Sequence, residues 1–315
     1  MTKFSIIDHQ HKSARLRTAL VKLGFKHTSS RDSDIYFHNC DYRINDYWDE
    51  IHKAKSNGAR IVIFSHAAPV TLSYDGGTYS ASDDVDLYLA QSPGQKEIMQ
   101  RFGYPHRIEV IGWHYCDIKP FKPVDKVRSI LLAPGHPACE SDKCLLHNDA
   151  QDKTFHGCAY QHANKKVYKI LRGMDCRLAV RFARDLGKTG LKMDKGVQYQ
   201  KTDYLLESAV KAIEKVDMVV SNNCTFASLA IALGKPVVMY GQEISRQLNA
   251  NKEIVPYQHW GLYKGYLRYP YEIFEVSDPQ ALIEYAGKNE AVEWRERFIG
   301  DPLDTDKLFE CMNDL

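Results

Sequence analysis

Short apolar segments alternate with helical segments along the whole 315-residue chain. This alternation is typical of parallel strands that are joined by crossover helices, because strands buried on both faces form nearly continuous apolar runs. In the first part of the chain the pattern predicts strands at Phe4–Asp8, Asp34–Asn39, Arg60–His66, Asp86–Ser92 and Arg107–Gly112, with helices at His11–Leu23, Arg43–Ser56 and from Pro93 onward. The chain is therefore expected to fold as an α/β protein.

The alternation begins a second time after Ile118–Asp125, a stretch that combines two prolines with charged residues and is typical of a linker. The second series predicts strands at Ser129–Pro134, Cys176–Phe182, Gly196–Gln200, Asp217–Asn222, Pro236–Tyr240 and Tyr271–Val276, with helices at Gln161–Leu171, Asp203–Lys215 and Thr225–Leu233. We therefore expect two Rossmann-like domains that face a cleft, at residues 1–120 and 121–290. Mainly helical residues 291–315 are expected to pack back toward the first domain.

Composition narrows the class of protein. The chain has 42 Lys and Arg against 40 Asp and Glu, and a net charge of +2 gives no support for bulk binding to nucleic acid. No apolar run approaches the roughly 18 residues that span a bilayer, and Met1–Asp8 lacks the layout of a signal peptide. We therefore expect a cytoplasmic protein without a transmembrane segment, whose eight cysteines are reduced.

The clearest candidate site follows the predicted strand Asp217–Asn222. This strand ends in a polar loop that includes Asn223, and a helix opens at about Thr225, whose hydroxyl can cap it. The free N–H groups and the dipole at the start of a helix attract anions, and Ser228 places a second hydroxyl one turn further on. The alternative is a structural cap without a ligand.

The segment Asp217–Gly241 resembles the nucleotide-binding half of the GT-B glycosyltransferases and their relatives, which include the non-hydrolysing sugar-nucleotide epimerases and the glycerophosphotransferases of wall polymers. The resemblance consists of a strand with a polar exit, a helix of small and apolar residues, the sequence Gly234-Lys235-Pro236 and another strand. Weaker matches extend it to Asp84–Gly112, to Asp117 and to Trp294–Asp304.

The resemblance implies a nucleotide-sugar donor site, for a UDP-sugar, in the second domain. The donor diphosphate would meet the start of the Thr225 helix, and other donor contacts would come from residues at further strand exits. The donor-binding residues so implied are Gly135, His136, Arg181, Asn223, Thr225, Ser228, Gln242 and Glu243. A pairwise salt bridge is the alternative explanation for Arg181 and for Glu243.

Two departures separate the chain from relatives within this group. The epimerases carry a Glu within the corresponding helix, whereas Phe226–Leu233 contains no acidic residue. The glycerophosphotransferases have an acidic residue and paired hydroxyls at the loop where this chain has Asn222, Asn223 and Cys224, and they commonly need a basic membrane-binding helix that is missing here. A simple glycosyltransferase is therefore favoured over both.

A catalytic base is expected in the first domain, which holds the acceptor in such enzymes. His66 ends a predicted strand, and a neutral imidazole is suited to accept a proton from a hydroxyl. Asp75, which precedes two glycines, is the competing candidate. The alternatives are a strand-end histidine bonded to backbone and an ordinary turn aspartate.

Soft metal ligands are concentrated between residues 139 and 162. They are Cys139, Cys144, His147, His156, Cys158 and His162, but their spacing matches no zinc finger. A long insertion that lines the donor or acceptor site, with Asp149, Asp152 and Asn164 available for polar contacts, is the favoured interpretation, and a structural zinc site is the alternative. No cofactor is expected, since Asp84-Val85-Asp86 leads into a strand and is better explained as a cap and surface charge.

The predicted function is a metal-independent, base-assisted glycosyltransferase that uses a nucleotide-diphosphate sugar. The alternatives are an epimerase, hydrolase or glycerophosphotransferase-like enzyme, or a non-catalytic nucleotide-binding module. The acceptor stays open among a glycan, a small molecule and a hydroxymethylated DNA base. Lysines at 188, 192, 195 and 201 are most simply a solvated surface.

Overall fold

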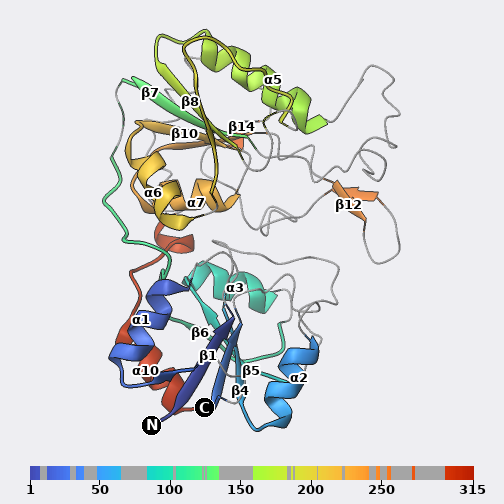
Figure 1. Cartoon of the computed structure of the whole chain (residues 1–315), viewed down its shortest axis with the longest axis vertical. Coiled ribbons are helices and arrows are strands. Elements are labelled where there is room, and N and C mark those ends of the chain that lie inside the picture. The colour runs from blue at the N-terminus through green and yellow to red at the C-terminus, as the bar shows by residue number, and fades with distance from the viewer. Residues whose placement is uncertain are drawn as a thin grey trace. The chain divides into compact units, whose positions relative to one another are not determined.

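The computed structural model describes residues 1–7, 13–28, 33–38, 48–64, 84–101, 104–122, 124, 126–134, 159–182, 186, 189–203, 205–221, 224–240, 246–248, 254–256, 272–273 and 295–315. The chain forms two compact units (Figure 1). Unit 1 contains Met1–Ile118 and Trp294–Leu315, and unit 2 contains Lys119–Gln258 and Arg268–Glu293. Each unit has its own parallel sheet, so the predicted α/β architecture with two Rossmann-like parts is confirmed.

The sheet of unit 1 has the strand order β2-β1-β3-β4-β5-β6. Its strands are β1 (Lys3–Ile7), β2 (Lys26–His27), β3 (Ile35–His38), β4 (Arg60–Phe64), β5 (Val85–Ala90) and β6 (Ile108–Val110). All neighbouring pairs are parallel, so the carboxyl ends of the strands meet at one edge. This is the edge at which open α/β sheets bind ligands.

Helices cover both faces of this sheet. They are α1 (Ala14–Lys22), α2 (Trp48–Ser56), α3 (Pro93–Arg101) and α10 (Thr305–Asn313). The buried side chains of Leu16 on α1 and Leu308 on α10 pack with Phe37 and Phe64 of the sheet. Figure 1 shows α1 and α10 on the same side of the strands, with α2 on the other side. Residues from the N-terminal and the C-terminal parts of the chain therefore share the core of unit 1.

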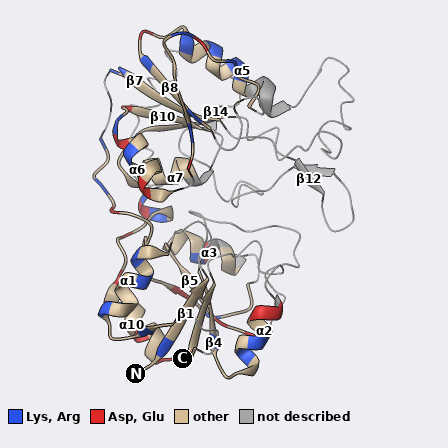
Figure 2. Ribbon diagram, in the orientation of Figure 1, with Lys and Arg blue, Asp and Glu red and all other residues tan. Residues whose placement is uncertain are grey.

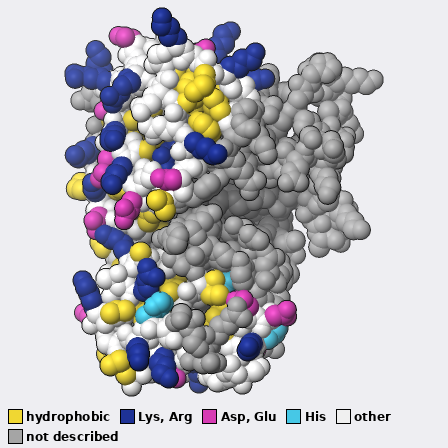
Figure 3. Space-filling model, viewed as in Figure 1, with side chains coloured by type: hydrophobic (Ala, Val, Ile, Leu, Met, Phe, Trp, Pro, Cys, Tyr) yellow, Lys and Arg dark blue, Asp and Glu magenta, His cyan; other side chains and the backbone are white. Residues whose placement is uncertain are grey.

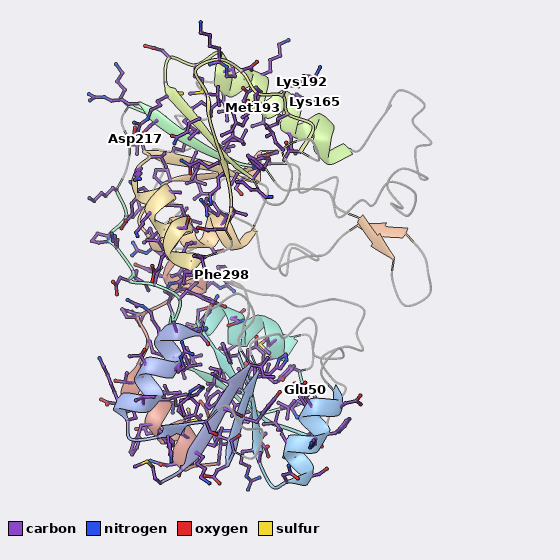
Figure 4. The ribbon with its side chains drawn as sticks, in the orientation of Figure 1. Glu50, Lys165, Lys192, Met193, Asp217 and Phe298 are labelled. Carbon is purple, nitrogen blue, oxygen red and sulfur yellow. The ribbon has the colours of Figure 1, made fainter. Side chains whose placement is uncertain are left out.

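The C-terminal segment is bonded to the end of β6. The Trp113 N–H donates to the Asp301 carbonyl at 2.7 Å, and the Asp304 N–H donates to the Ile111 carbonyl at 2.8 Å. Gly112 has a φ of +83°, and a Cβ atom there would lie 2.3 Å from the Pro302 carbonyl oxygen, so the position requires glycine. The side chain of Phe298, labelled in Figure 4, is buried in the same unit.

The sheet of unit 2 has the strand order β14-β11-β10-β7-β8-β9. Its parallel strands are β7 (Ser129–Ala133), β8 (Arg177–Phe182), β9 (Gln198–Lys201), β10 (Met218–Ser221), β11 (Val237–Tyr240) and β14 (Glu272–Ile273). The short strands β12 (Arg246–Leu248) and β13 (Ile254–Pro256) form a separate antiparallel pair. The sequence pattern did not predict β2, β12 or β13, because none of them lies within an apolar run long enough to mark a strand.

Three of the described helices pack on this second sheet. The helix α5 (Ala159–Arg172) packs Val167 and Leu171 against the side chains of Leu178 and Val180 on β8. The helices α6 (Leu206–Glu214) and α7 (Cys224–Ala232) contact each other and lie on the other face (Figure 1). In the described part of the chain, no helix is long and apolar enough to cross a membrane.

Candidate functional site

The carboxyl ends of three adjacent strands meet where α7 begins in unit 2. The strand β10 lies between β7 and β11, and its last residue, Ser221, pairs with Ala133 on one side and Met239 on the other. The Ser221 hydroxyl donates a hydrogen bond of 3.1 Å to the Ala133 carbonyl, which fixes the exits of β7 and β10 together. The start of α7 follows Ser221 by three residues, so its free N–H groups lie at this edge.

The first turn of α7 is suited to an anion. The helix begins at Cys224, so Thr225 lies in its first turn rather than at the expected cap position. No acidic residue lies in this turn to offset the positive end of the helix dipole. The side chain of Ser228 is fully buried, so its hydroxyl belongs to the packing of α7 against β10 and β11 in this structure.

The side chain of Asn164 is part of a buried network at the same edge. The Tyr240 hydroxyl donates to Asn164 Oδ1 at 2.8 Å, and Asn164 Nδ2 donates to the Thr189 carbonyl at 2.9 Å. Both side chains are buried, and burial raises the pKa of Tyr240. Asn164 therefore fixes α5 to the end of β11 in this structure, a structural role that differs from the polar ligand contact suggested by its sequence position.

Arg181 is buried and bonded within unit 2. Its side chain is 6% exposed, and Nη2 donates to Thr202 Oγ1 at 3.0 Å and to Ser208 Oγ at 3.1 Å. The same nitrogen lies 3.3 Å from Asp203 Oδ1. Leu178 and Val180 pack toward α5, so Arg181 points to the opposite face of the sheet. These contacts match the salt-bridge alternative that the sequence left open.

The Gly-Lys-Pro sequence lies at the opposite, amino edge of this sheet. Lys235 Nζ donates to the Val216 carbonyl at 2.7 Å, and burial lowers the pKa of this amine. Gly234 has a φ of +74°, and a Cβ there would lie 2.0 Å from the Pro120 carbonyl oxygen. The motif thus connects α7 and β11 to the segment that enters unit 2, and its role is structural.

Several predicted site residues lie outside the described residues. They are His66, Asp75, Gly135, His136, Asn223, Gln242 and Glu243. The same holds for Asp149, Asp152 and the candidate zinc ligands from Cys139 to Cys158, and for the side chains of Thr225 and His162. Among the residues that the structure does describe, no group of three or more His, Cys, Asp or Glu side chains could hold a metal ion.

Buried polar side chains mark the carboxyl edge of the sheet in unit 1. His38 ends β3, Gln91 follows β5, and His114 follows β6; all three are fully buried. No local sequence pattern distinguishes these three residues, although the rule that ligands bind at strand exits applies equally to their positions.

His114 is a neutral imidazole. Its ring packs edge-on against Phe64 at the end of β4, with 5.5 Å between the ring centroids. Burial lowers the pKa of His114 to about 4, although a hydrogen bond to the Gly112 backbone partly opposes the shift. At neutral pH the ring therefore carries no charge and can both donate and accept a hydrogen bond.

Gln91 is held on a rigid turn between β5 and α3. The Ser92 hydroxyl accepts from the Gln95 N–H at 3.2 Å, and Gln95 Oε1 accepts from the Gln91 N–H at 2.8 Å, which resembles a capping box. Both polar atoms of the Gln91 side-chain amide are buried and have no hydrogen-bond partner in the described part of the chain. This amide is available to a polar ligand or to water at the sheet edge.

Charged side chains of both signs are spread over the described surface. Lys and Arg line the outer side of α5 (Figure 2) and are scattered over the viewed face of unit 2 (Figure 3). Lys192, Lys195 and Lys201 are exposed, as expected for a solvated surface. Near the amino end of β5, Asp84 forms a salt bridge with His52, and Asp86 forms salt bridges with Lys55 and Arg60.

The chain is similar to known proteins in its fold. No protein-family model and no curated protein sequence matches the chain. A UDP-GlcNAc 2-epimerase from Methanocaldococcus jannaschii, solved with UDP-GlcNAc and UDP, superposes with a TM-score of 0.59 at 11% identity, covering 99% of this chain and 100% of that one. A Listeria monocytogenes protein assigned as a UDP-N-acetylglucosamine 2-epimerase gives 0.57 at 11% identity, covering 99% and 95%.

The wall teichoic acid polymerase TagF is also similar. One of its structures superposes with a TM-score of 0.53 at 12% identity, covering 99% of this chain and 88% of that chain. The chain therefore has the GT-B fold, which glycosyltransferases share with UDP-GlcNAc epimerases.

Proposed function

We propose that this GT-B protein is a glycosyltransferase that moves a sugar from a nucleotide-diphosphate sugar, a UDP-sugar, to a hydroxyl acceptor. The observation that carries the proposal is the start of α7 at the carboxyl edge of the sheet in unit 2, without an acidic residue in its first turn. A structurally similar epimerase was solved with UDP-GlcNAc and UDP, which supports the choice of uridine.

The proposed mechanism needs positioning, a base and stabilisation of the leaving group. The N–H groups of the first turn of α7 would bind the donor diphosphate and stabilise the charge that develops as UDP departs. His66 or Asp75 would take the proton of the acceptor hydroxyl. The other donor contacts are proposed for Gly135, His136, Asn223, Thr225, Gln242 and Glu243. Arg181 and Ser228, which the sequence also suggested, keep the contacts within unit 2 described above.

We propose that the reaction needs no metal ion. The one Asp-x-Asp spacing considered, Asp84-Val85-Asp86, lies at the amino end of β5, whereas ligands of such sheets bind at the carboxyl edge. Asp86 is bonded to Lys55 Nζ at 2.6 Å, to Arg60 Nη1 at 3.1 Å and to the Ile61 N–H at 2.8 Å. These contacts support a structural role for the pair.

A UDP-sugar epimerase is the second candidate, because the M. jannaschii epimerase superposes better than TagF, with TM-scores of 0.59 and 0.53. Against it, the helix Cys224–Ala232 contains no acidic residue, whereas the epimerases carry a Glu in this helix. An epimerase would convert its UDP-sugar without an acceptor, and a transferase would release UDP only when an acceptor hydroxyl is supplied.

The donor site is tested by thermal unfolding of the full chain with a panel of nucleotides and nucleotide sugars. A ligand at about 100 times its dissociation constant adds about 2.7 kcal/mol to the free energy of unfolding, which is a clear shift in Tm. We expect UDP and one UDP-sugar to stabilise the wild type, and Thr225→Ala to reduce that shift.

Thr305→Ala is the matched control, because Thr305 is an exposed threonine at the start of α10 in unit 1. It should leave the nucleotide shift unchanged. A protein that no nucleotide stabilises would contradict the donor site. Binding of a UDP-sugar without turnover, unchanged by His66→Ala and Asp75→Ala across an acceptor panel, would instead indicate a non-catalytic binding module.

A further inference from the structure

A cavity of about 590 Å³ lies in unit 2, between the sheet and α6. Arg177, Ala179 and Arg181 of β8 line it, because alternate residues of this strand point away from α5. In the part of the chain that the structure describes, no residue of α7 lines the cavity. It is therefore distinct from the donor site proposed at the start of α7.

Small side chains leave this space open. Ala179 lies on the sheet side of the cavity and Ala212 on the α6 side. Gln198 and Gln200 of β9 also line the cavity, next to Ala179 and Arg181 in the strand register. The volume is typical of sites for small molecules, and the amides provide donors and acceptors for hydroxyl groups.

Arg181 presents unused donors to this cavity. The guanidinium is nine-tenths buried, yet its three polar contacts, to Thr202, Asp203 and Ser208, all involve Nη2. In the described residues, its Nε and Nη1 groups have no hydrogen-bond acceptor. These groups can therefore donate hydrogen bonds to a ligand that enters the cavity.

Three further cations line the other end of the cavity. Arg177 begins β8, and its Nη2 donates to the Lys215 carbonyl at 3.1 Å, so β8 and the end of α6 meet there. Lys211 lies one turn earlier on the same face of α6. None of these three makes a salt bridge among the described residues, and the lining contains only two carboxylates, Asp203 and Glu207.

We propose that this cavity binds a phosphorylated sugar. The phosphate would lie at Arg177, Lys211 and Lys215, and the sugar hydroxyls would bond to Arg181, Gln198 and Gln200. Four residues of strand separate Arg177 from Arg181, about 13 Å between their Cα atoms, so a ligand that contacts both ends of the cavity must be larger than a lone anion. The site does not depend on the proposed transferase activity and would serve as a second, regulatory position.

The test is calorimetric titration of the full chain with glucose 6-phosphate as the probe, and with glucose and inorganic phosphate as comparisons. We expect saturable 1:1 binding of the ester, with at least tenfold weaker binding of either comparison. The double variant Lys211→Gln with Lys215→Gln should weaken ester binding at least tenfold. These side chains are exposed, so the fold is expected to persist, which circular dichroism can verify.

The matched control is Lys165→Gln with Lys192→Gln, which removes the same charge from exposed positions of unit 2 outside the cavity (Figure 4). Equal losses in both double variants would show a general charge effect and overturn the proposal. Equal affinity for the ester and inorganic phosphate, or no saturable binding, would also overturn it. Thr225→Ala should leave this binding unchanged, which separates the result from that of the donor site.

Discussion

The hydroxyl of Tyr240, at the end of β11, donates a hydrogen bond of 2.8 Å to Oδ1 of Asn164 on α5. Both side chains are buried, and this bond joins two elements that are 76 residues apart in the chain. It fixes the helix that follows β7 to the exit of β11, and so helps to shape the edge at which α7 begins.

Tyr240→Phe should therefore destabilise unit 2. The change keeps the ring but removes the donor to a buried amide oxygen, which costs about 1–3 kcal/mol of unfolding free energy. Chemical denaturation measures the loss. Tyr199→Phe is the comparison: the Tyr199 hydroxyl is bonded to the Tyr168 hydroxyl and the Lys192 carbonyl, but the residue is only partly buried, so water can take over these contacts and the loss should be smaller. Equal stability of wild type and Tyr240→Phe would contradict the role given to this bond.

Gly112→Ala should destabilise unit 1 far more than Gly58→Ala. Both residues have a positive φ, +83° and +87°, so both substitutions carry the backbone strain of about 1 kcal/mol. A Cβ at Gly112 would also meet the Pro302 carbonyl, whereas nothing lies within 4 Å of one at Gly58. We expect the loss of unfolding free energy to be at least twice as large for Gly112→Ala, measured by urea unfolding. Equal losses would argue against close packing of the C-terminal segment on β6.

His114 should make unit 1 sensitive to acid. Its pKa is about 4 in the folded protein against 6.5 in the unfolded chain. As the pH falls from 6.5 toward 4, the unfolded chain takes up a proton that the folded protein does not, which lowers the free energy of unfolding by about 3 kcal/mol. Above pH 6.5 this contribution to stability is fully present.

His114→Gln should flatten this part of the pH dependence. Unfolding free energies measured between pH 7 and 4.5 should decrease less steeply in the variant than in the wild type. Identical slopes for wild type and His114→Gln would contradict a neutral, buried imidazole.

Asp217→Asn should weaken the pairing of β10 with β7. Asp217, labelled in Figure 4, accepts hydrogen bonds from the Arg128 N–H, the Ser129 N–H and the Ser129 hydroxyl at 2.8–2.9 Å. Burial alone would raise the pKa of this carboxyl, but these bonds outweigh it and lower the pKa below its usual value. The stabilisation is therefore present above about pH 4 and is lost as the pH falls through the folded pKa.

We expect Asp217→Asn to lose about 1.5–3 kcal/mol at pH 7, the range for hydrogen bonds to a charged group, and the difference from wild type to shrink in acid. Denaturation at pH 7 and pH 3 measures both values. Asp301→Asn changes an exposed carboxyl in unit 1 and should have little effect at either pH. A constant difference between the two pH values would exclude the ionised carboxylate as its source.

The proposed base predicts a loss in rate. If His66 takes the proton of the acceptor hydroxyl, His66→Ala should lower kcat by about 10²–10⁴ and leave binding of the UDP-sugar unchanged. The rate with each acceptor and the thermal shift with the donor measure the two effects. His52→Ala should affect neither. A normal rate in His66→Ala with a large loss in Asp75→Asn would transfer the role to Asp75.

Much of the fold could be predicted from local sequence. The strands at residues 60–64 and 129–133 contain apolar runs bounded by polar residues, and each run can be buried on both faces only in a sheet covered by helices. The sequence Gly234-Lys235-Pro236 marked the turn before β11, although its position at the amino edge of the sheet shows that it supports the fold rather than a ligand.

The role of individual polar residues needed the tertiary structure. Arg181 lies near a strand exit in sequence and Asn164 in the insertion that follows β7, yet the first points into a cavity beside α6 and the second bonds to Tyr240. The burial of His114 and Gln91 could not be predicted from the sequence, because burial at a sheet edge is produced by segments far apart in the chain. Hydrophobic periodicity indicates which residues share the apolar face of one helix or strand. Which polar group faces which partner depends on how separate elements pack, and only the folded chain decides that.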